Sequence, residues 1–421
     1  MLLTRSHRLA YCLCLCLAAC DDASPAKPAP QAPPEPAPAP PARATPLPEP
    51  PAPTPPAPAP EPPKKLTLDA TPPKLAPVDD ATKAKAAGLV GQVDGLSFPF
   101  AVASDVTNAR AFLHLAHTSE APNVVAAALR GMARTYAITP KPDAPLIDAD
   151  YHAVVAYRLA SPDVTIASAA FEAAHSSTDV EPPSAAVVGV LVEIAQHHES
   201  LAARYLALDA LSEMSSPTGP VQGAFLQALD DASVPFVALA LEEMTFLAAK
   251  IVDRAALMTR LTERLASPDA GVRGGVAEVM TQMARDDADR KELTKLLLPL
   301  LDDPHPYPRA AAAYAMGVMR HGPASAKLVA MFDDLELARF RVEGWANLEG
   351  SASDTTLMVM SGDSVASVAL MALSLISTKT ATPLDYAADV VYDARGHADH
   401  TAALAKGKAW YEAHQHELPS G

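Results

Sequence analysis

The chain has 421 residues and a formal net charge of −16, and it combines 49% hydrophobic residues with only 5% aromatic residues. An acidic surface disfavours nucleic acid and anionic lipid headgroups as partners, because both are themselves negatively charged. Few runs alternate apolar and polar residues, which argues against a sheet-based fold. We therefore expect an all-α protein in which alanine supplies much of the helix interfaces.

The first twenty residues, MLLTRSHRLAYCLCLCLAAC, show the features of a bacterial export signal in the usual order. Arg5 and Arg8 form a positive segment, and Leu9–Leu17 is an apolar core too short to span a bilayer. The final LAAC resembles the lipobox, at which a signal peptidase cuts before a cysteine that becomes lipid-modified. The resemblance implies a signal peptide at 1–19 and lipid attachment at Cys20. An ordinary signal peptide, or an apolar N-terminus with a chance cysteine, is the alternative.

Cys20 is the last cysteine of the chain, so a mature protein that begins there has no further thiol for a disulfide, redox centre or Cys-ligated metal. Loss of the two arginines changes its net charge to 31 − 49 = −18. We expect a membrane-anchored lipoprotein of the bacterial cell envelope that faces the periplasm or the cell surface. Asp21 and Asp22 follow the anchor, as in inner-membrane lipoproteins of enterobacteria. That rule is not general, so inner and outer membrane both stay open.

Residues 21–78 hold 23 of the 42 prolines, many of them in Ala-Pro alternation. Such a segment cannot form a helix or a sheet ladder, and it favours extended polyproline conformations. At ~3.1 Å per residue, its 58 residues reach up to about 180 Å. We predict a disordered, Pro/Ala-rich tether over residues 20–87 that holds a folded domain away from the membrane. Docking of PxxP-type segments to a partner is the alternative.

We expect the folded domain to span 88–416 and to leave a C-terminal tail at 417–421. Its clearest unit is Leu257–Met283. Three leucines four residues apart form one apolar helix face, and Ser267-Pro268-Asp269 then offers a turn and an N-cap. A second helix carries Val272, Val276, Val279, Met280 and Met283 on one face. Neither helix can bury its apolar face without a partner, which is the physical basis of a stacked solenoid.

The pattern of this unit recurs along the chain. The pentapeptide LASPD occurs at Leu159–Asp163 and at Leu265–Asp269, 106 residues apart, which equals three steps of about 35 residues. Acidic pairs recur in the same phase at the turns, which favours N-capping over acid–base catalysis. Arg273 marks the second helix of its unit, and we place the equivalent positions at Val125, Ala167, Arg204, Val237, Arg309, Arg339, Ser367 and Thr401.

The region from Leu89 to His416 resembles the HEAT and HEAT-like repeat family. The family's turn with Pro-Asp and its second helix opening with Val-Arg are matched best in three units, at Pro268-Asp269…Val272-Arg273, Pro304…Arg309-Ala310 and Asp334…Arg339. The resemblance implies a right-handed α-solenoid of about nine antiparallel helix pairs. In the family this arginine often pairs with an aspartate of the same or the neighbouring repeat, so we expect a structural role for Arg204, Arg273, Arg309 and Arg339.

The sequence contains no P-loop, G-x-G-x-x-G, H-E-x-x-H or G-x-S-x-G motif. His114/His117 and His397/His400 are i, i+3 pairs that can share a helix face, but neither pair has an obvious further ligand nearby, so we interpret them as surface histidines. His197-His198 lies at a predicted hinge and is expected to face solvent. We therefore predict no catalytic residues, no cofactor and no metal.

The functional surface of such a solenoid is usually the concave face, which the second helices line. Its polar candidates are Glu278, Gln282, Glu343 and Asn347. We expect a scaffold for protein–protein interactions, attached to the membrane by its lipid anchor, with no nucleic acid and no small-molecule substrate; the sequence does not identify the protein partner. Two alternatives stay open, namely a HEAT-like enzyme or enzyme accessory of the lyase type and a structural or wall-associated envelope element.

Overall fold

A computed structural model describes residues 66, 68, 71–138, 149–178, 182–348, 350, 352–358, 364–392 and 398–419. The chain divides into two units, Met1–Pro62 and Pro63–Gly421, and all of these residues belong to the second. The predicted signal peptide, Cys20 and most of the predicted tether lie outside the described residues. Among the helices described, none is long and apolar enough to cross a membrane.

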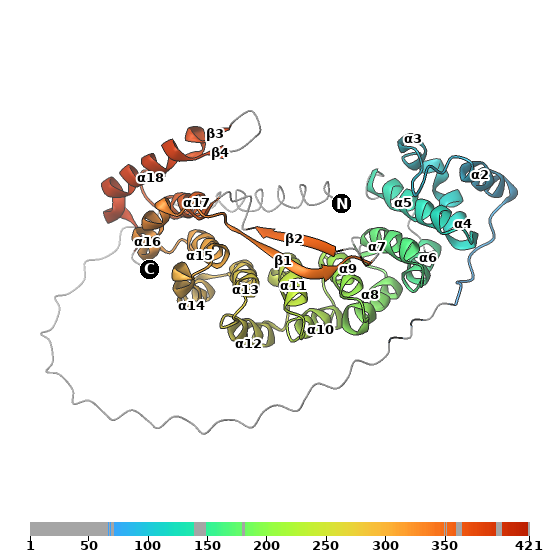
Figure 1. The fold of residues 1–421 in the computed structure, drawn as a ribbon, viewed down its shortest axis with the longest axis horizontal. Coiled ribbons are helices and arrows are strands. Elements are labelled where there is room, and N and C mark those ends of the chain that lie inside the picture. Colours follow the sequence, from blue (N-terminus) through green and yellow to red (C-terminus); the bar gives the residue numbers. More distant parts are fainter. Residues whose placement is uncertain are drawn as a thin grey trace, which may run out of the picture. The chain divides into compact units, whose positions relative to one another are not determined.

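The second unit consists mainly of helices in two layers, here called outer and inner (Figure 1). Each outer helix is followed by an inner helix that packs against it, and each inner helix also packs against the inner helix of the next pair. The outer helices are α4 (Ala109–Thr118), α6 (Ala149–Leu159), α8 (Ala185–His197), α10 (Gly219–Ala228), α12 (Arg254–Arg264), α14 (Asp287–Leu297) and α16 (Ser325–Ala330). The inner helices are α5 (Pro122–Ile138), α7 (Val164–Thr178), α9 (Leu201–Ser212), α11 (Val234–Leu247), α13 (Ala270–Gln282), α15 (Pro306–Val318) and α17 (Val365–Ser377).

Seven such pairs follow one another through the described residues, from α4–α5 to α16–α17. The prediction of an α-solenoid built from helix pairs is confirmed. About nine units were expected, and the described residues form these seven pairs together with additional helices at the ends. The remaining helices are α2 (Asp80–Val90), α3 (Phe100–Ala103) and α18 (Thr401–His414), together with the 3-10 turns η1 (Val106–Asn108), η2 (Ala248–Lys250), η3 (Leu298–Asp302), η4 (Gly322–Ala324), η5 (Met331–Asp333), η6 (Ala387–Asp389) and η7 (Gln415–Glu417).

The helix pair predicted around Leu265–Met283 forms as expected. Leu257 and Leu261 of α12 are fully buried, and so are the valines and methionines of α13. Asp269 caps α13, since its carboxylate accepts the backbone N–H of Val272 at 2.9 Å. This charge-assisted cap satisfies one of the amides that a helix N-terminus leaves without an internal partner. The predicted turn therefore both ends α12 and starts α13.

The predicted phase of the repeat is confirmed on the inner helices. Arg273 is the fourth residue of α13, and five other marker positions are likewise the fourth residue of an inner helix, at Val125, Ala167, Arg204, Val237 and Arg309. Ser367 is the third residue of α17 and Thr401 the first of α18. Arg339 is the exception, because it begins a β-strand and not a helix. Its assignment to a second helix was wrong.

Small residues bring the inner helices close together. A Cβ added at Gly317 of α15 would lie 2.6 Å from the Cα of Ala372 in α17, so only glycine permits this approach. Alanines fill much of the remaining contact, as in α15, where Ala310 to Ala313 are all completely buried. Close packing of small side chains thus supplies much of the helix contact in a chain with only 5% aromatic residues.

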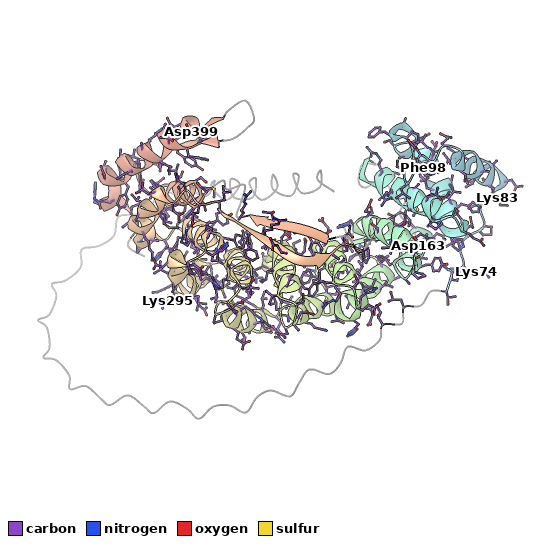
Figure 2. All side chains as sticks on the ribbon, viewed as in Figure 1. Lys74, Lys83, Phe98, Asp163, Lys295 and Asp399 are labelled. Atoms are coloured by element: carbon purple, nitrogen blue, oxygen red, sulfur yellow. The ribbon has the colours of Figure 1, made fainter. Side chains whose placement is uncertain are left out.

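The folded region is longer at both ends than the predicted span of 88–416. α2 begins at Asp80, inside the segment assigned to the tether, and buries Ala86 and Leu89 against α4. Phe98 follows and packs on Phe112 of α4 at a ring-centroid distance of 5.1 Å (Figure 2). In the predicted tail, the Glu417 carboxylate accepts the N–H of Ala381 at 3.2 Å, and Leu418 packs against the core.

Two short antiparallel sheets accompany the helices. β1 (Arg339–Ala346) pairs with β2 (Ala352–Met358), and β3 (Val391–Tyr392) pairs with β4 (Ala398–Asp399). Gly350, in the turn between β1 and β2, has a φ of +78°, which glycine adopts more easily than other residues. The near absence of strands expected from the sequence therefore holds for the helix pairs but not for the segments on either side of α17.

The β1–β2 hairpin is an insertion within one repeat. Inner helices α11 and α15 each begin three residues after an aspartate of the preceding turn, Asp231 and Asp303. The equivalent aspartate before α17 is Asp334, but α17 begins 31 residues later, so 31 − 3 = 28 residues are additional here. The hairpin leaves the helix array at this point and crosses the inner helices α9, α11, α13 and α15 (Figure 1).

Candidate binding site on the inner helices

The base of the insertion is closed by hydrogen bonds to the start of α17. The carbonyl oxygens of Asp334 and Glu336 accept the backbone N–H groups of Ala366 and Val365 at 2.8 and 2.9 Å. Arg309 of α15 clamps the same turn through ion pairs with the carboxylates of Asp334 at 2.7 Å and Glu336 at 2.6 Å. Because α15 packs directly on α17, the stack of helices is continuous without any contribution from the hairpin.

One face of the hairpin is apolar and the other is polar. Val342 and its partner Thr355, and Phe340 with its partner Leu357, lie on the face that is buried or half-buried. The intervening Arg341, like Glu343, has an exposed side chain. Since side chains of a strand alternate between its two faces, this pattern turns the apolar face towards the inner helices that β1 contacts.

Phe340 is seated in a notch formed by small and aromatic residues of α13 and α15. A Cβ at Gly271 would collide with the Phe340 ring, so the missing side chain creates the space that the ring fills. The ring of Tyr307 stacks on that of Phe340 with centroids 6.2 Å apart, and the ring of His305 meets it edge-on at 5.5 Å. We call Gly271, His305 and Tyr307 the Phe340 notch.

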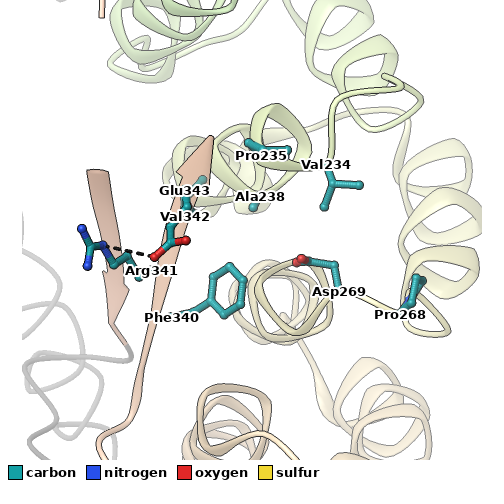
Figure 3. A pocket seen from close by; sticks show the side chains of 9 residues that line it. All are labelled: Val234, Pro235, Ala238, Pro268, Asp269, Phe340, Arg341, Val342 and Glu343. Carbon is teal, nitrogen blue, oxygen red and sulfur yellow. Dashed lines mark ion pairs between the residues drawn. The ribbon is translucent and has the colours of Figure 1, made fainter. Parts of the chain in front are cut away.

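A cavity of about 550 Å³ remains open beside the notch, between the hairpin, the start of α11 and the turn before α13 (Figure 3). The helix side contributes Val234, Pro235 and Ala238 of α11 and the turn before α13, whereas the hairpin side contributes residues 340–343. Asp269 points into this space in Figure 3, although one of its oxygens is used for capping α13. The cavity walls are mainly apolar, with charges of both signs at the edge.

A titratable pair lies next to the notch on the inner layer. The Tyr307 hydroxyl donates a hydrogen bond of 2.7 Å to the carboxyl group of Glu278 on α13. Burial raises the pKa of Glu278 to about 8. The hydrogen bond from Tyr307 acts in the opposite direction and lowers this pKa, whereas the nearby charge of Glu242 raises it further. Burial also raises the pKa of Tyr307 well above its ordinary value. Gly274 admits the Tyr307 ring, because a Cβ at that position would collide with it.

Three of the four predicted arginines form a ladder along the turns, whereas Arg339 is an exposed residue at the start of β1. Arg273 binds both carboxylate oxygens of Asp303, at 2.7 and 2.8 Å. Arg204 and Arg309 each pair with one carboxylate oxygen of the aspartate in the next turn, Asp231 and Asp334. Each of these three aspartates also accepts the backbone N–H two residues further on. These three pairs join α9, α13 and α15 to the repeat that follows each of them, which is the structural role expected from the resemblance.

Of the polar residues predicted on the concave face, only Glu278 lies on an inner helix next to the notch. Gln282 is the last residue of α13 and is exposed. Glu343 and Asn347 are not on a second helix, since Glu343 belongs to β1 and Asn347 follows it. Glu343 nevertheless reaches the cavity through the hairpin. Sequence reasoning missed Phe340, although the alternation of Arg339-Phe340-Arg341-Val342 was a local signal for a strand.

The histidines singled out in the sequence do not converge. The His198 ring accepts the N–H of Ser200 at 2.9 Å at the start of α9, and burial lowers its pKa. Burial, followed by the charge of His117, also lowers the pKa of His114 on α4. His397 lies outside the described residues. Within the part of the chain that the structure describes, no three His, Cys, Asp or Glu side chains are grouped so that they can hold a metal ion.

No known family profile matches the chain, and neither does any curated protein. Among solved structures, the chain is similar to an engineered protein with 16% identity and a TM-score of 0.42, over 71% of this chain and 76% of that one. A Kap121p mutant matches with 13% identity and a TM-score of 0.41, over 72% of this chain and 34% of that one. A chain of the Kap95:Nup1 complex matches with 12% identity and a TM-score of 0.41, over 71% and 38%. The chain thus spans little more than a third of the last two proteins.

Proposed function

We propose that this protein is a HEAT-like scaffold that binds another protein through its inner helices while a lipid on Cys20 holds it in the bacterial cell envelope. The observation that carries the binding role is the mainly apolar cavity between the hairpin, the start of α11 and the turn before α13. Stacked helical repeats are well suited to such a role because their helices present a continuous surface. We assign it a binding role and not a catalytic one.

The exposed valine at the cavity supports a binding surface. Val234 is 43% exposed and lies beside Pro235 at the start of α11, where it borders apolar walls. Exposed apolar side chains that adjoin a cavity are typical of surfaces that become covered by a partner. Val252 is 84% exposed but does not line the cavity, so it provides a matched comparison.

Proximity labelling from the helical domain in intact cells tests the binding role. We expect a specific set of labelled proteins, and we expect Val234→Asp to lose it while Val252→Asp keeps it. An aspartate suits the first turn of a helix, so Val234→Asp should leave α11 folded. Recovery of no labelled protein would refute the scaffold function. If both variants lose the labelled proteins, or both keep them, the binding surface does not lie at Val234. Co-sedimentation of the protein with peptidoglycan would favour the wall-associated alternative.

Membrane fractionation tests the anchor separately. Cys20→Ala should release the protein from the membrane fraction, because a covalent lipid on this cysteine supplies the attachment. Cys16→Ala is the matched control, since that cysteine lies in the part removed with the predicted signal peptide. Continued membrane association of Cys20→Ala would exclude lipid anchoring at this residue.

A further inference from the structure

We propose that the β1–β2 hairpin is a built-in occupant of the partner-binding face, and that a partner segment with an aromatic residue between basic residues replaces it. This proposal rests on the proposed function of protein binding and adds the chemistry of the partner. The argument has three parts, namely the independence of the hairpin from the helix stack, the selectivity of the notch and the open cavity beside it.

The hairpin is attached to the fold in a way that allows it to leave. Its base is closed by the bonds from Ala366 and Val365 to the carbonyls of Asp334 and Glu336, and Arg309 fixes the same turn. All of these contacts precede or follow β1 and β2. Departure of the hairpin therefore leaves the α15–α17 interface and the arginine ladder unchanged.

The notch selects an aromatic side chain. Gly271 lacks the Cβ that would block the ring, and Tyr307 and His305 offer a stacked and an edge-on contact. Such aromatic contacts contribute beyond the area that they bury, so the ring is a suitable anchor for an extended segment. Any competing segment must therefore place a similar ring where Phe340 now lies.

The charges around the cavity indicate which residues should flank the aromatic ring in a partner segment. Arg339 and Arg341 lie on either side of Phe340, and Arg341 shares the cavity wall with Asp269. The chain as a whole is acidic, which favours the approach of a basic segment. A partner with the local pattern basic–aromatic–basic would reproduce what β1 now supplies.

The open cavity gives such a segment a first contact. It lies between the hairpin and the turns at Val234 and Pro268, and it is not filled by any described side chain. A segment can enter there before the hairpin leaves, so that replacement does not require a spontaneously empty face. This route favours an extended segment, because the helices on both sides are already packed in pairs.

The test uses the full chain with Cys20→Ala, in which residues 339–361 are replaced by a short Gly-Ser linker. The probe is a fluorescein-labelled peptide of residues 336–346, ELARFRVEGWA, followed by fluorescence anisotropy. We expect this variant to bind the peptide about tenfold or more tightly than the chain that retains its hairpin, and we expect Phe340→Ala in the peptide to cost at least about tenfold. Gly271→Ala in the protein should weaken binding, whereas Gly189→Ala on α8 should not.

Equal binding by the chains with and without the hairpin, or by the two peptides, would overturn the proposal. Loss of the helical circular dichroism on excision would refute the independence of the hairpin. In that case amide hydrogen exchange on the intact chain decides whether the peptide can replace the hairpin. Excess peptide should speed amide exchange across residues 339–358, and the peptide with Phe340→Ala should not. These measurements use a peptide and no cellular partner. If the peptide binds as expected but proximity labelling recovers no protein, the scaffold function is refuted and the replacement of the hairpin is not.

Discussion

At the residue scale, the arginine ladder shows how one side chain connects two repeats. Arg273 is 13% exposed and Asp303 is 5% exposed, and the guanidinium also donates to the carbonyls of Ser267 and Pro268 at 2.8 and 3.0 Å. Burial would raise the pKa of Asp303, but hydrogen bonds from Arg273 and from the His305 amide keep it below its ordinary value. The pair is therefore satisfied in its buried position, which an isolated charge would not be.

Arg273→Ala should destabilise the protein by about 2–4 kcal/mol, because it leaves a buried carboxylate with fewer partners. The folded-state pKa of Asp303 lies below the ordinary value of 3.8, so the stability that the pair contributes is present above about pH 4. It is lost as the pH falls through the folded-state pKa. Urea unfolding at several pH values measures both effects. Arg290→Ala is the control, since its partner Asp287 is 98% exposed; an equal effect would contradict a special role for the ladder.

Glu278 predicts a pH dependence of the opposite sign. Its folded-state pKa of about 8 exceeds its ordinary value of 4.5, so the folded protein holds a proton that the unfolded chain releases. Stability contributed by this group is complete below pH 4.5 and falls as the pH rises towards 8. Glu278→Gln keeps an acceptor for the Tyr307 hydroxyl and should stabilise the protein by roughly 2–4 kcal/mol at pH 8.5, with little change at pH 5. Thermal unfolding of this variant and of the exposed control Glu263→Gln measures the difference; an equal response of both would exclude a raised pKa.

At the element scale, the hairpin depends on a contact that no local pattern contains. Phe340 fits only because Gly271, 69 residues earlier in the chain, has no side chain. The expectation of a second helix at Arg339 came from its spacing of 30 residues after Arg309, which fits the phase of the repeat. The alternation of Phe340 and Val342 with charged residues indicated a strand, but it is too short to outweigh a repeat pattern without knowledge of the notch.

The inner and outer helices were predictable for a physical reason. Each carries an apolar face at a spacing of three or four residues, and caps such as Asp269 mark its start, so the local signals agree with the tertiary packing. The ends of the domain were less predictable, because α2 has alternating lysines and alanines without a clear apolar face. Its contact with α4 makes Ala86 and Leu89 part of the core.

Gly271→Ala should lift the hairpin without unfolding the helices. The new methyl group occupies the space of the Phe340 ring, while alanine favours the helical backbone of α13. We expect faster amide exchange across 339–358 and unchanged exchange in α13 and α15. Gly189→Ala, with nothing within 4 Å of the added Cβ, should stabilise α8 by about 0.5–1 kcal/mol and leave exchange in the hairpin unchanged. Unaltered exchange of the hairpin in Gly271→Ala would show that Phe340 does not lie in the notch.

At the scale of the whole molecule, the repeats provide a surface and the insertion covers part of it. Stability of such an array is shared between each repeat and its neighbours, so a segment can be added at one turn without disturbing distant pairs. The 28 additional residues before α17 fit this rule, since the neighbouring interfaces of α13, α15 and α17 are complete. The position of the hairpin over the inner helices is the claim on which the proposed binding chemistry depends.

That position is tested most directly by cysteine cross-linking in a background in which Cys12, Cys14, Cys16 and Cys20 are all replaced by alanine, so that the chain has no other thiol. Glu343→Cys on β1 and Val234→Cys on α11 line the same cavity and should be joined by a short bis-maleimide, as mass spectrometry of the digested protein can show. Val252→Cys, which is more exposed than Val234 and outside the cavity, should give little cross-linking with Glu343→Cys. Equal cross-linking of the two pairs, or none for Glu343→Cys with Val234→Cys, would contradict a hairpin that lies across the inner helices.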